Sequence, residues 1–324
     1  MTKAIRIHEH GGPEVLKWED VEAGDPGEGE VRIRHTAVGL NFIDCYQRSG
    51  LYPMDLPLTL GSEAAGVIEA VGPGVEGLSA GQRVAYAGGQ LGSYAEARVM
   101  NAGVLAPVPD GIEDQTAAAM MLKGMTAQML LFKCYPVKAG DTILVHAAAG
   151  GVGSIMCQWG KHLGATVIGT VGSDAKAEIA KAHGCDHPIN YATENFAERV
   201  REITGSAGVP VVYDSVGKET FENSLDCLSK FGYLISFGNA SGPAPAVEPL
   251  TLMAKGSVFL NRPTLMHYIA DHGLRLEAAR ALFEVVESGA VKIEVGQTFP
   301  LADAAKAHAA LESRATTGST VLLP

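Results

Sequence analysis

Cysteine is scarce in this 324-residue sequence, and its five copies are widely spaced. Successive cysteines lie 89, 23, 28 and 42 residues apart, whereas structural zinc sites use pairs roughly two to four residues apart. The odd number also argues against a complete set of disulfides. We therefore expect no structural zinc site and reduced thiols at Cys45, Cys134, Cys157, Cys185 and Cys227.

Long apolar runs are missing as well. The most apolar stretch, residues 117–137, is interrupted by Lys123, and a membrane-spanning helix needs about 20 apolar residues. Residues 1–12 contain no apolar core of the kind that a signal peptide requires. Together with the unpaired cysteines, these features predict a cytoplasmic protein without membrane insertion.

Positive charge is also in short supply. The sequence has 25 Lys and Arg against 36 Asp and Glu, a net charge of −11 at pH 7. A surface with this balance repels a phosphate backbone, so we expect no nucleic-acid ligand. Hydrophobic residues at 47% and charged residues at 19% are the proportions of a packed globular protein. At about 150 residues per domain, the length allows about two domains.

Two patterns of secondary structure divide the chain. The first hundred residues predict short strands joined by turns, because residues 31–37 alternate in polarity and similar segments follow at 63–71, 83–86 and 93–99. From about residue 139, strands alternate with helices, which is typical of a parallel, doubly wound sheet. The predicted strands of this second part are 142–146, 166–171, 210–214 and 233–237, and its helices include 174–183, 194–203 and 221–228.

The last 60 residues combine both kinds of element. They predict helices at 274–288 and 302–313 and a short strand at 320–323. We expect this segment to pack on the N-terminal part of the chain.

A glycine-rich turn joins the first strand of the second part to a helix. The strand 142–146 runs into Ala147-Ala148-Ala149-Gly150-Gly151-Val152-Gly153, and the helix that follows has one apolar face. Glycines let the backbone approach a pyrophosphate, whose charge the free N–H groups and the positive dipole end of the helix then hold. Although the spacing differs from GxGxxG, the order strand, glycine turn, helix predicts a dinucleotide-binding site.

The next strand bears on the choice of cofactor. An NAD site usually has an acidic residue about 20 residues after the glycines, which takes the ribose hydroxyls. Here the strand ends at Val171 and is followed by Gly172, Ser173, Asp174 and Lys176. The small residues and the lysine suit a 2′-phosphate, while Asp174 is explained as an acid in the first turn of a helix. We therefore predict NADPH rather than NADH.

Further motifs extend the similarity to a known family. Together with residues 41–44 (NFID), 48–53 (RSGLYP), 61–66 (GSEAAG) and 212–217 (VYDSVG), the glycine turn resembles the quinone oxidoreductases of the medium-chain dehydrogenase/reductase superfamily. The resemblance covers essentially the whole chain. It implies an α/β fold with a GroES-like, β-rich catalytic domain at 1–124, a Rossmann domain with a doubly wound parallel sheet that binds NADPH at 125–264, and a C-terminal segment at 265–324 that completes the catalytic domain. It also implies a homodimer.

Zinc alcohol dehydrogenases of the same superfamily hold a catalytic metal, and this chain departs from their pattern. The positions that match their ligands are Asn41, Ser62 and Lys123, which are not a zinc-binding set. Cys45 lies four residues after the first ligand position and is interpreted as a small packing residue. The resemblance therefore implies catalysis without a metal. Quinones suit such an enzyme because they accept hydride without an activated oxygen.

The resemblance also assigns roles to individual residues. Asn41, Tyr46 and Tyr52 are the implied catalytic residues beside the nicotinamide and the substrate, although each tyrosine is equally well explained as a packed aromatic. All ten histidines stay unassigned. The implied cofactor-binding residues are Thr126, Gly150, Gly151, Val152, Gly153, Gly172, Ser173, Lys176, Tyr191, Ser215, Val216, Phe237, Gly238, Asn239, Arg262 and Arg314.

Three functions stay open at this point. The first is an NADPH-dependent quinone reductase acting on a small-molecule quinone. The second is an NADPH-dependent reductase of an activated C=C bond in an enone, enal or enoyl thioester, with Tyr46 or Tyr52 as the proton donor. The third is a non-catalytic NADPH-binding protein with a structural or RNA-associated role, against which the negative net charge argues.

Overall fold

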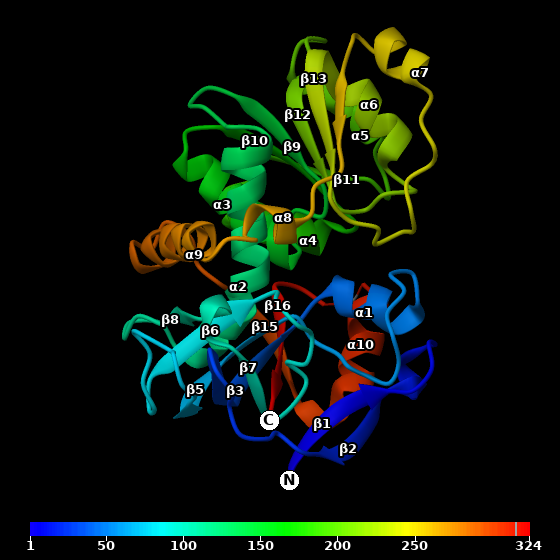
Figure 1. The fold of residues 1–324 in the computed structure, drawn as a ribbon. Helices are drawn as coiled ribbons and strands as arrows, with labels where there is room; N and C mark the ends of the chain where they lie inside the picture. Colours follow the sequence, from blue (N-terminus) through cyan, green and yellow to red (C-terminus); the bar gives the residue numbers. More distant parts are fainter. Residues whose placement is uncertain (315) are drawn as a thin grey trace. The chain divides into compact units, whose positions relative to one another are not determined.

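The computed structural model describes residues 1–314 and 316–324. The chain divides into two compact units. Unit 1 comprises Met1–Met125, Ile269–Glu287 and Ile293–Pro324, and unit 2 comprises Thr126–Tyr268 and Ser288–Lys292. In Figure 1 the colours of unit 1 are blue, cyan and orange to red, and unit 2 is mostly green and yellow. The boundary between Met125 and Thr126 falls inside helix α2 (Asp114–Gln128).

Unit 1 is rich in β-structure. Its helices are α1 (Phe42–Ser49), α9 (His272–Glu287) and α10 (Ala304–Glu312), besides the first part of α2 and the 3-10 turns η1 (Pro13–Val15), η2 (Ala102–Val104) and η4 (Leu301–Asp303). Its strands are β1 (Thr2–Ile7), β2 (Lys17–Val21), β3 (Glu30–Leu40), β4 (Leu58–Thr59), β5 (Glu63–Val71), β6 (Arg83–Ala87), β7 (Ala97–Asn101), β8 (Ala106–Pro107), β15 (Val295–Pro300) and β16 (Ser319–Leu323).

The long strand β3 organises the main sheet of unit 1. That sheet has the order β15-β16-β3-β5-β6-β8, and β7 pairs with the first half of β3. The second half of β3 pairs with β16, so that Val321 lies opposite Gly39. The expectation that the last residues pack on the N-terminal part is therefore confirmed. Because helix α1 follows β3 directly and Leu40 lies opposite Thr320, this pairing also places the start of α1 near the beginning of β16.

One predicted strand of unit 1 is in the wrong place. The sequence predicts a strand at 93–99, but β7 begins only at Ala97. The preceding residues run beside β1 instead, where the Ile5 N–H donates to Tyr94 O over 2.8 Å. Tyr94 is fully buried in the unit's hydrophobic core. Alternating polarity cannot distinguish a ladder strand from an extended segment that carries one core tyrosine.

Unit 2 alternates strands and helices. Its strands are β9 (Thr142–Val145), β10 (Thr166–Val171), β11 (His187–Asn190), β12 (Val209–Asp214), β13 (Leu228–Ser236) and β14 (Phe259–Asn261). Its helices are the π-helical segment η3 (Met129–Cys134), α3 (Gly151–His162), α4 (Asp174–Ala182), α5 (Phe196–Ile203), α6 (Phe221–Cys227), α7 (Pro249–Ala254) and α8 (Leu265–Tyr268).

All six strands of unit 2 are parallel, in the order β11-β10-β9-β12-β13-β14. In chain order this is 3-2-1-4-5-6, the doubly wound arrangement of dinucleotide-binding folds. The direction of winding reverses between β9 and β12, and ligands of such sheets bind beyond the carboxyl ends of the strands at that point. The structure thus confirms the predicted fold class.

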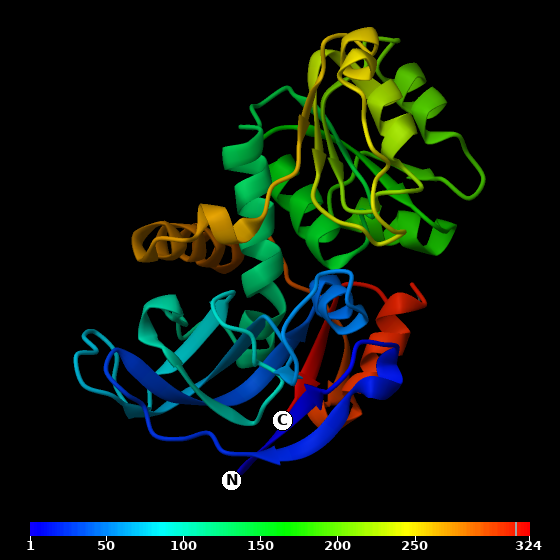
Figure 2. The ribbon, with the colours of Figure 1, turned by 45° about the vertical axis from the view of Figure 1, so that its right-hand side comes forward.

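Helices cover both faces of this sheet (Figures 1 and 2). On one face Leu144 and Ile168 pack in a single core with Phe196 of α5 and Leu225 of α6. On the other face α3 lies so close that a Cβ at Gly160 would be 3.1 Å from Ile143. Two buried faces explain why the strands are apolar throughout rather than alternating.

A short segment from late in the chain belongs to unit 2. Ser288–Lys292 is held there by Gln158 of α3, whose Nε2 donates to Lys292 O over 3.0 Å. The Lys292 N–H in turn donates to Gln158 Oε1 over 2.8 Å. Within residues 1–314 and 316–324, no helix combines the length and the apolar character needed to cross a membrane.

Candidate functional site

The predicted glycine turn lies at the carboxyl end of β9. Ala147 adopts a left-handed backbone conformation with φ 52°, and Gly150 then caps the first turn of α3. A Cβ at Gly153 would lie only 2.2 Å from Ala147 O, so only glycine permits this close approach of turn and helix. Gly151 and Val152 are half-buried in the first turn of α3. The turn therefore presents a helix N-terminus, the usual binding site for a pyrophosphate.

A histidine to which the sequence analysis assigned no role immediately precedes this turn. His146 is fully buried, with Nδ1 2.8 Å from Thr170 Oγ1 and Nε2 2.9 Å from Ser224 Oγ. Ser224 Oγ donates to Thr220 O over 2.8 Å, so it accepts from His146 Nε2–H. Burial lowers the pKa of His146. This neutral imidazole joins β9, β10 and α6 immediately before the glycine turn.

A second turn at the switch point is built on Asp214, at the end of β12. The fully buried Asp214 carboxylate accepts the N–H groups of Val216 over 2.8 Å and Gly217 over 3.0 Å. The Phe237 N–H donates to Asp214 O over 2.7 Å. A Cβ at Gly238 would lie 2.4 Å from Ser215 O. The predicted residues Ser215, Val216, Phe237, Gly238 and Asn239 therefore lie in two adjoining turns at the ends of β12 and β13.

The predicted 2′-phosphate residues gather at the ends of β10 and β11. Ser173 is the N-cap of α4, and its Oγ accepts the Lys176 N–H over 3.3 Å. A Cβ at Gly172 would lie 2.7 Å from Tyr191 Oη, so the tyrosine lies over the glycine. Asp174, the first residue of α4, accepts a 2.7 Å hydrogen bond from Asn190 Nδ2. Small residues, a lysine and a helix N-terminus thus occur together, as the sequence predicts.

The remaining predicted cofactor residues lie elsewhere. Arg262 follows β14 and donates from Nη1 to Ser236 O over 2.8 Å. Four strand spacings separate the ends of β10 and β14, which is about 19 Å, so Arg262 belongs with the Phe237–Asn239 turn and not with Lys176. Thr126 is the first residue of unit 2, within α2. Arg314 belongs to unit 1, where it follows α10 with φ 59°.

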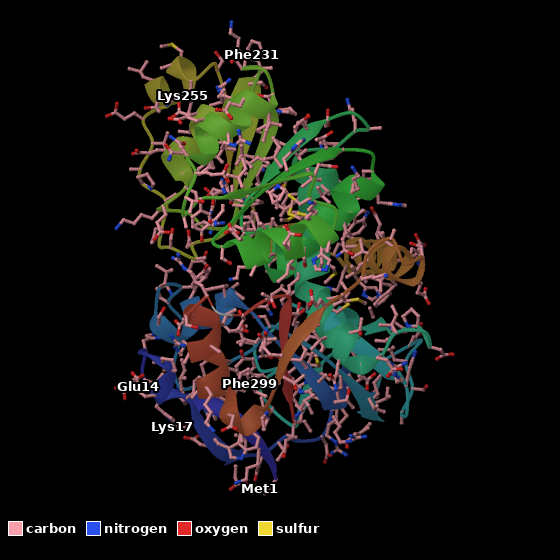
Figure 3. The ribbon with its side chains drawn as sticks, turned by 180° about the vertical axis from the view of Figure 1, so that it is seen from behind. Met1, Glu14, Lys17, Phe231, Lys255 and Phe299 are labelled. Carbon is pink, nitrogen blue, oxygen red and sulfur yellow. The ribbon has the colours of Figure 1, made fainter. Side chains whose placement is uncertain are left out.

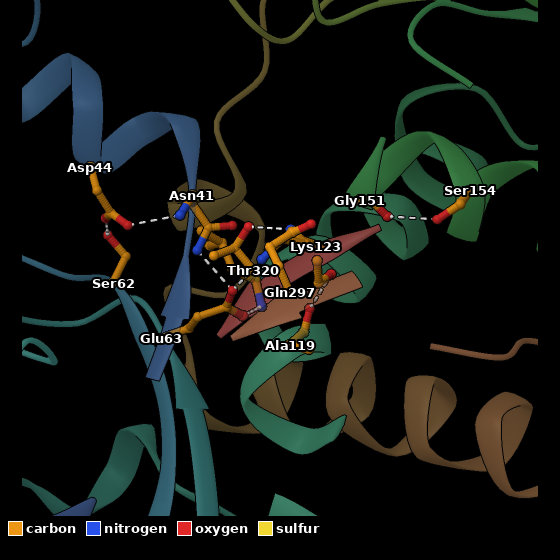
Figure 4. A network of polar contacts seen from close by, with 12 residues as sticks. Asn41, Asp44, Ser62, Glu63, Ala119, Lys123, Gly151, Ser154, Gln297 and Thr320 are labelled. Atoms are coloured by element: carbon orange, nitrogen blue, oxygen red, sulfur yellow. Dashed lines mark hydrogen bonds and ion pairs between the residues drawn. The ribbon is translucent and has the colours of Figure 1, made fainter. Parts of the chain in front are cut away.

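In unit 1, a buried carboxylate connects two of the three positions that match zinc ligands (Figure 4). Glu63 Oε1 accepts hydrogen bonds from Asn41 Nδ2 and from Lys123 Nζ, both over 2.7 Å. Glu63 Oε2 accepts the Leu122 N–H over 2.6 Å. The Glu63 side chain is completely buried and that of Lys123 is 8% exposed. The Glu63 carboxylate therefore neutralises the Lys123 ammonium at this point.

A second buried carboxylate holds the start of helix α1. Asp44 accepts the Asn41 N–H over 2.9 Å, the Tyr94 hydroxyl over 3.0 Å and the Ser62 hydroxyl over 3.1 Å. Burial is the main cause that raises the pKa of Asp44 to about 7, with Glu63 adding to it, while the three donors oppose the shift. Asn41 is therefore fixed both by its backbone N–H and by its side chain.

This arrangement continues to the C-terminal part of unit 1. Tyr94 Oη lies 3.0 Å from His308 Nε2, and His308 Nδ1 lies 3.0 Å from Arg48 Nη1. Arginine can only donate, so Nδ1 accepts and Nε2 carries the proton. Burial, and then the charge of Arg48, lowers the pKa of His308 to about 3. Arg48 also pairs with Glu312 over 2.6 Å.

The two predicted catalytic tyrosines lie on helix α1 and just after it. Tyr46 is on α1, and Tyr52 follows it, with its N–H donating to Tyr46 O over 3.1 Å. The two rings meet edge to face with centroids 5.3 Å apart, and both side chains are half-buried. Asn41, Tyr46 and Tyr52 are thus brought together by one short helix. Their catalytic roles stay a prediction.

No cluster of three or more His, Cys, Asp or Glu side chains suited to a metal ion occurs within 1–314 and 316–324. Cys45 is buried on α1, with Sγ 3.5 Å from His308 Nδ1. Burial raises the pKa of its thiol far above the ordinary value. Cys45 therefore packs in the core as a neutral thiol.

Comparisons with known proteins agree with this geometry. Family models described as "Alcohol dehydrogenase GroES-like domain" and "Zinc-binding dehydrogenase" match residues 27–110 and 151–271. A quinone oxidoreductase of Pseudomonas aeruginosa is 53% identical over 326 residues, which cover 100% of both proteins. The chain belongs to the quinone oxidoreductase family.

Other members of the family are similar in sequence and structure. The crystal structure of Escherichia coli quinone oxidoreductase complexed with NADPH matches with a TM-score of 0.98 and 48% identity, over 99% of this chain and 100% of that chain. A 2-haloacrylate reductase of a Burkholderia species is 48% identical over 331 residues, covering 100% of this chain and 99% of the relative.

Several residues of both sites escaped the sequence analysis. Glu63 and Asp214 stand in motifs that carried the family resemblance, but nothing in their sequence context indicates that each organises a buried network. Asn190 and His308 are distant in sequence from the groups they bind. For Lys123 the sequence does hold a signal. It lies within the apolar segment 117–137, where a buried lysine requires a partner of opposite charge.

Proposed function

We propose that this chain is an NADPH-dependent quinone oxidoreductase that works without a catalytic metal. The observation that carries the proposal is the end of β10, where Gly172, Ser173 and Lys176 stand beside the glycine turn of a parallel, doubly wound sheet. The 53% identity to a quinone oxidoreductase over the whole chain supports the substrate class.

The residues at the carboxyl edge of the unit 2 sheet fit a dinucleotide. Positions 153, 172 and 238 have no space for a Cβ, so each requires glycine for the close packing of the turns at this edge. We assign the pyrophosphate to Gly150–Gly153 and the 2′-phosphate to Gly172, Ser173, Lys176 and Tyr191. The nicotinamide half is assigned to Thr126, Ser215, Val216, the turn Phe237–Asn239 and Arg262.

NADPH, when bound, supplies the hydride that reduces the substrate. The chain's own contribution is to position the acceptor and to provide donors for the oxygen that gains charge. Glu63 accepts from Asn41 Nδ2, and because a carboxylate only accepts, the amide nitrogen faces Glu63 with one N–H remaining for another acceptor. We assign substrate positioning to Asn41 and proton donation to Tyr46 or Tyr52.

Metal independence is supported by the ion pair at the matching position. Lys123 occupies a position where zinc relatives carry a ligand, and its ammonium already neutralises Glu63 over 2.7 Å. A divalent cation beside a buried ammonium would experience strong repulsion. A quinone needs only modest help with developing charge, which hydrogen-bond donors supply.

A second candidate is reduction of an activated C=C bond. The observation that favours it is the 2-haloacrylate reductase at 48% identity over the whole chain. In that reaction Tyr46 or Tyr52 would deliver a proton to carbon rather than to oxygen.

We further propose a homodimer formed through strand β14. This strand is an edge of the unit 2 sheet, and Phe259 and Leu260 on it are 49% and 38% exposed. Phe259 stacks on Tyr233 with ring centroids 4.7 Å apart. Phe231, at the far end of unit 2 in Figure 3, is 66% exposed. An exposed apolar edge strand offers a template for pairing with another chain. Light scattering should show a dimer for the wild type and a monomer for Phe259→Glu.

The domain assignment and location follow the same proposal. We assign 1–124 and 265–324 to a catalytic domain and 125–264 to the NADPH-binding domain. A cytoplasmic location is supported by the five cysteines, all within the described residues and all present as thiols.

Steady-state NADPH oxidation with a panel of acceptors tests the proposed function. The panel contains a benzoquinone, a naphthoquinone, an enone, 2-chloroacrylate and a saturated aldehyde. We expect kcat/KM to be highest for the quinones. Highest kcat/KM for the enone or 2-chloroacrylate would favour the second candidate, and NADPH oxidation supported only by the saturated aldehyde would contradict both.

A further inference from the structure

Asp174 occupies the place where NAD-binding sheets carry the acid that accepts the ribose hydroxyls. Two residues, Gly172 and the N-cap Ser173, separate it from the end of β10. An ionised carboxylate there would favour NADH and would repel the 2′-phosphate of NADPH. The proposed function requires NADPH, so something in the structure has to account for this acid.

Asn190 is the residue that binds it. It ends β11 and lies opposite Val171, the last residue of β10, in the parallel ladder. Its Nδ2 donates to Asp174 Oδ1 over 2.7 Å. The hydrogen bond therefore joins the ends of two neighbouring strands and directs the carboxylate toward β11.

The amide of Asn190 has only one way to point. Its Oδ1 accepts the Ala192 N–H over 3.1 Å, which leaves Nδ2 facing Asp174. Its backbone N–H donates to Glu194 Oε1 over 3.1 Å, and its carbonyl accepts the Thr193 N–H over 3.1 Å. Only 8% of the residue is exposed. A flipped amide would place two N–H donors against the Ala192 N–H, so the orientation is fixed.

We propose that Asn190 is a specificity-determining residue, which selects NADPH by holding the Asp174 carboxylate against β11. Held there, the Asp174 Oδ1 atom is already occupied by Asn190 Nδ2, and the carboxylate is not free to turn toward the ribose hydroxyls of NADH. This inference rests on the proposed function, since it concerns the same cofactor site.

Binding titrations of NADPH and NADH test it without turnover. The Kd of each cofactor is measured by nicotinamide fluorescence for the wild type, Asn190→Ala, Asn190→Ser, Asp174→Asn and the double variant Asp174→Asn/Asn190→Ala. Serine still accepts the Ala192 N–H through its short side chain but does not reach Asp174. It therefore keeps the test valid if alanine loosens the turn.

The matched control is Asn195→Ala. Asn195 lies five residues further on, and its side chain caps α5 by accepting the Ala197 N–H over 3.1 Å. It has the same side chain and a similar structural duty, but it does not bind Asp174. Its substitution should lower thermal stability without changing the ratio of the two Kd values.

We expect Asn190→Ala and Asn190→Ser to raise the Kd of NADPH about tenfold, the effect of about 1.4 kcal/mol, and to lower the Kd of NADH. Asp174→Asn in the Asn190→Ala background should restore the NADPH Kd, because the released side chain is then neutral. Equal changes for both cofactors, or no recovery in the double variant, would overturn the proposal. A wild type that binds NADH more tightly than NADPH would overturn the proposed function as well. If the wild type prefers NADPH but the Asn190 variants do not behave as expected, only the role of Asn190 is overturned.

Discussion

Lys123 and Glu63 form a buried ion pair with 2.7 Å between Nζ and Oε1, at a point where related dehydrogenases hold zinc. The pair neutralises both charges inside unit 1 and leaves Glu63 to orient the amide of Asn41. The ion pair between these two residues therefore sets the charge balance of the candidate catalytic site.

Removing one partner of this pair should be costly. Lys123→Met leaves Glu63 buried without its counter-charge, which typically costs about 3–5 kcal/mol. Lys123→Met/Glu63→Gln should cost less than the sum of the two single variants in urea unfolding. The exposed pair Lys3–Asp20, with 2.8 Å between its charged atoms, is the control, and Lys3→Met should cost less than about 1 kcal/mol. Additive costs for the buried pair would mean that the two charges do not interact.

The same pair predicts the metal content. Purified protein should contain no stoichiometric zinc, and its NADPH-dependent quinone reduction should be unaffected by a chelator. Elemental analysis that finds about one zinc per chain, with activity lost when it is removed, would contradict metal independence.

Loss of a donor at the proposed catalytic residues should lower turnover more than cofactor affinity. Asn41→Ala or Tyr52→Phe removes a group that stabilises developing charge, which typically costs about 3 kcal/mol, or about a hundredfold in kcat. The Kd of NADPH should change little. Tyr135→Phe, whose hydroxyl bonds to Asp141 in unit 2, is the control. Unchanged kcat in both active-site variants would limit these residues to packing.

Charge should decide cofactor preference. Lys176 and Arg314 are the two cations among the cofactor-binding residues that the family resemblance implies besides Arg262, and charge-assisted hydrogen bonds to a phosphate contribute about 1.5–3 kcal/mol each. Lys176→Ala/Arg314→Ala should therefore raise the Kd of NADPH by about a hundredfold or more and leave that of NADH nearly unchanged. Equal losses for both cofactors would show that the cations support the fold instead.

The pKa values of unit 1 predict opposite effects on stability. Burial lowers the pKa of His308 to about 3 and that of His35 to about 4, so each stabilises the fold above pH 6.5 and loses this effect as the pH falls. The pKa of Asp44 is raised to about 7, so its contribution is full below about 3.8 and is lost as the pH rises through 7.

Asp44→Asn removes the pH-dependent contribution of Asp44 and leaves those of His308 and His35. The free energy of unfolding of the variant minus that of the wild type should rise by about 1.4 kcal/mol per pH unit between pH 4 and 7, the value for one proton. Urea unfolding across this range measures the difference. A difference that is independent of pH would mean that Asp44 titrates near its ordinary value.

The sequence determined the local features of this protein. Apolar strands alternating with helices predict the parallel sheet, because burial on both faces imposes that pattern on every strand. The turn at 147–153 and the small residues Gly172 and Ser173 predict a nucleotide site, because a backbone that approaches a phosphate leaves no room for side chains. The family motifs also indicated the candidate catalytic residues.

Only the tertiary structure decided which distant residues act together. Asn41 and Lys123 bind Glu63 from 22 and 60 residues away, and Arg48 binds His308 across 260 residues. The sequence explains Asp174 only as an acid in the first turn of a helix. Its partner Asn190 becomes its neighbour through the register of β10 against β11. Such contacts depend on strand order and register, which are set by packing over the whole sheet and leave no local signal in the residues themselves.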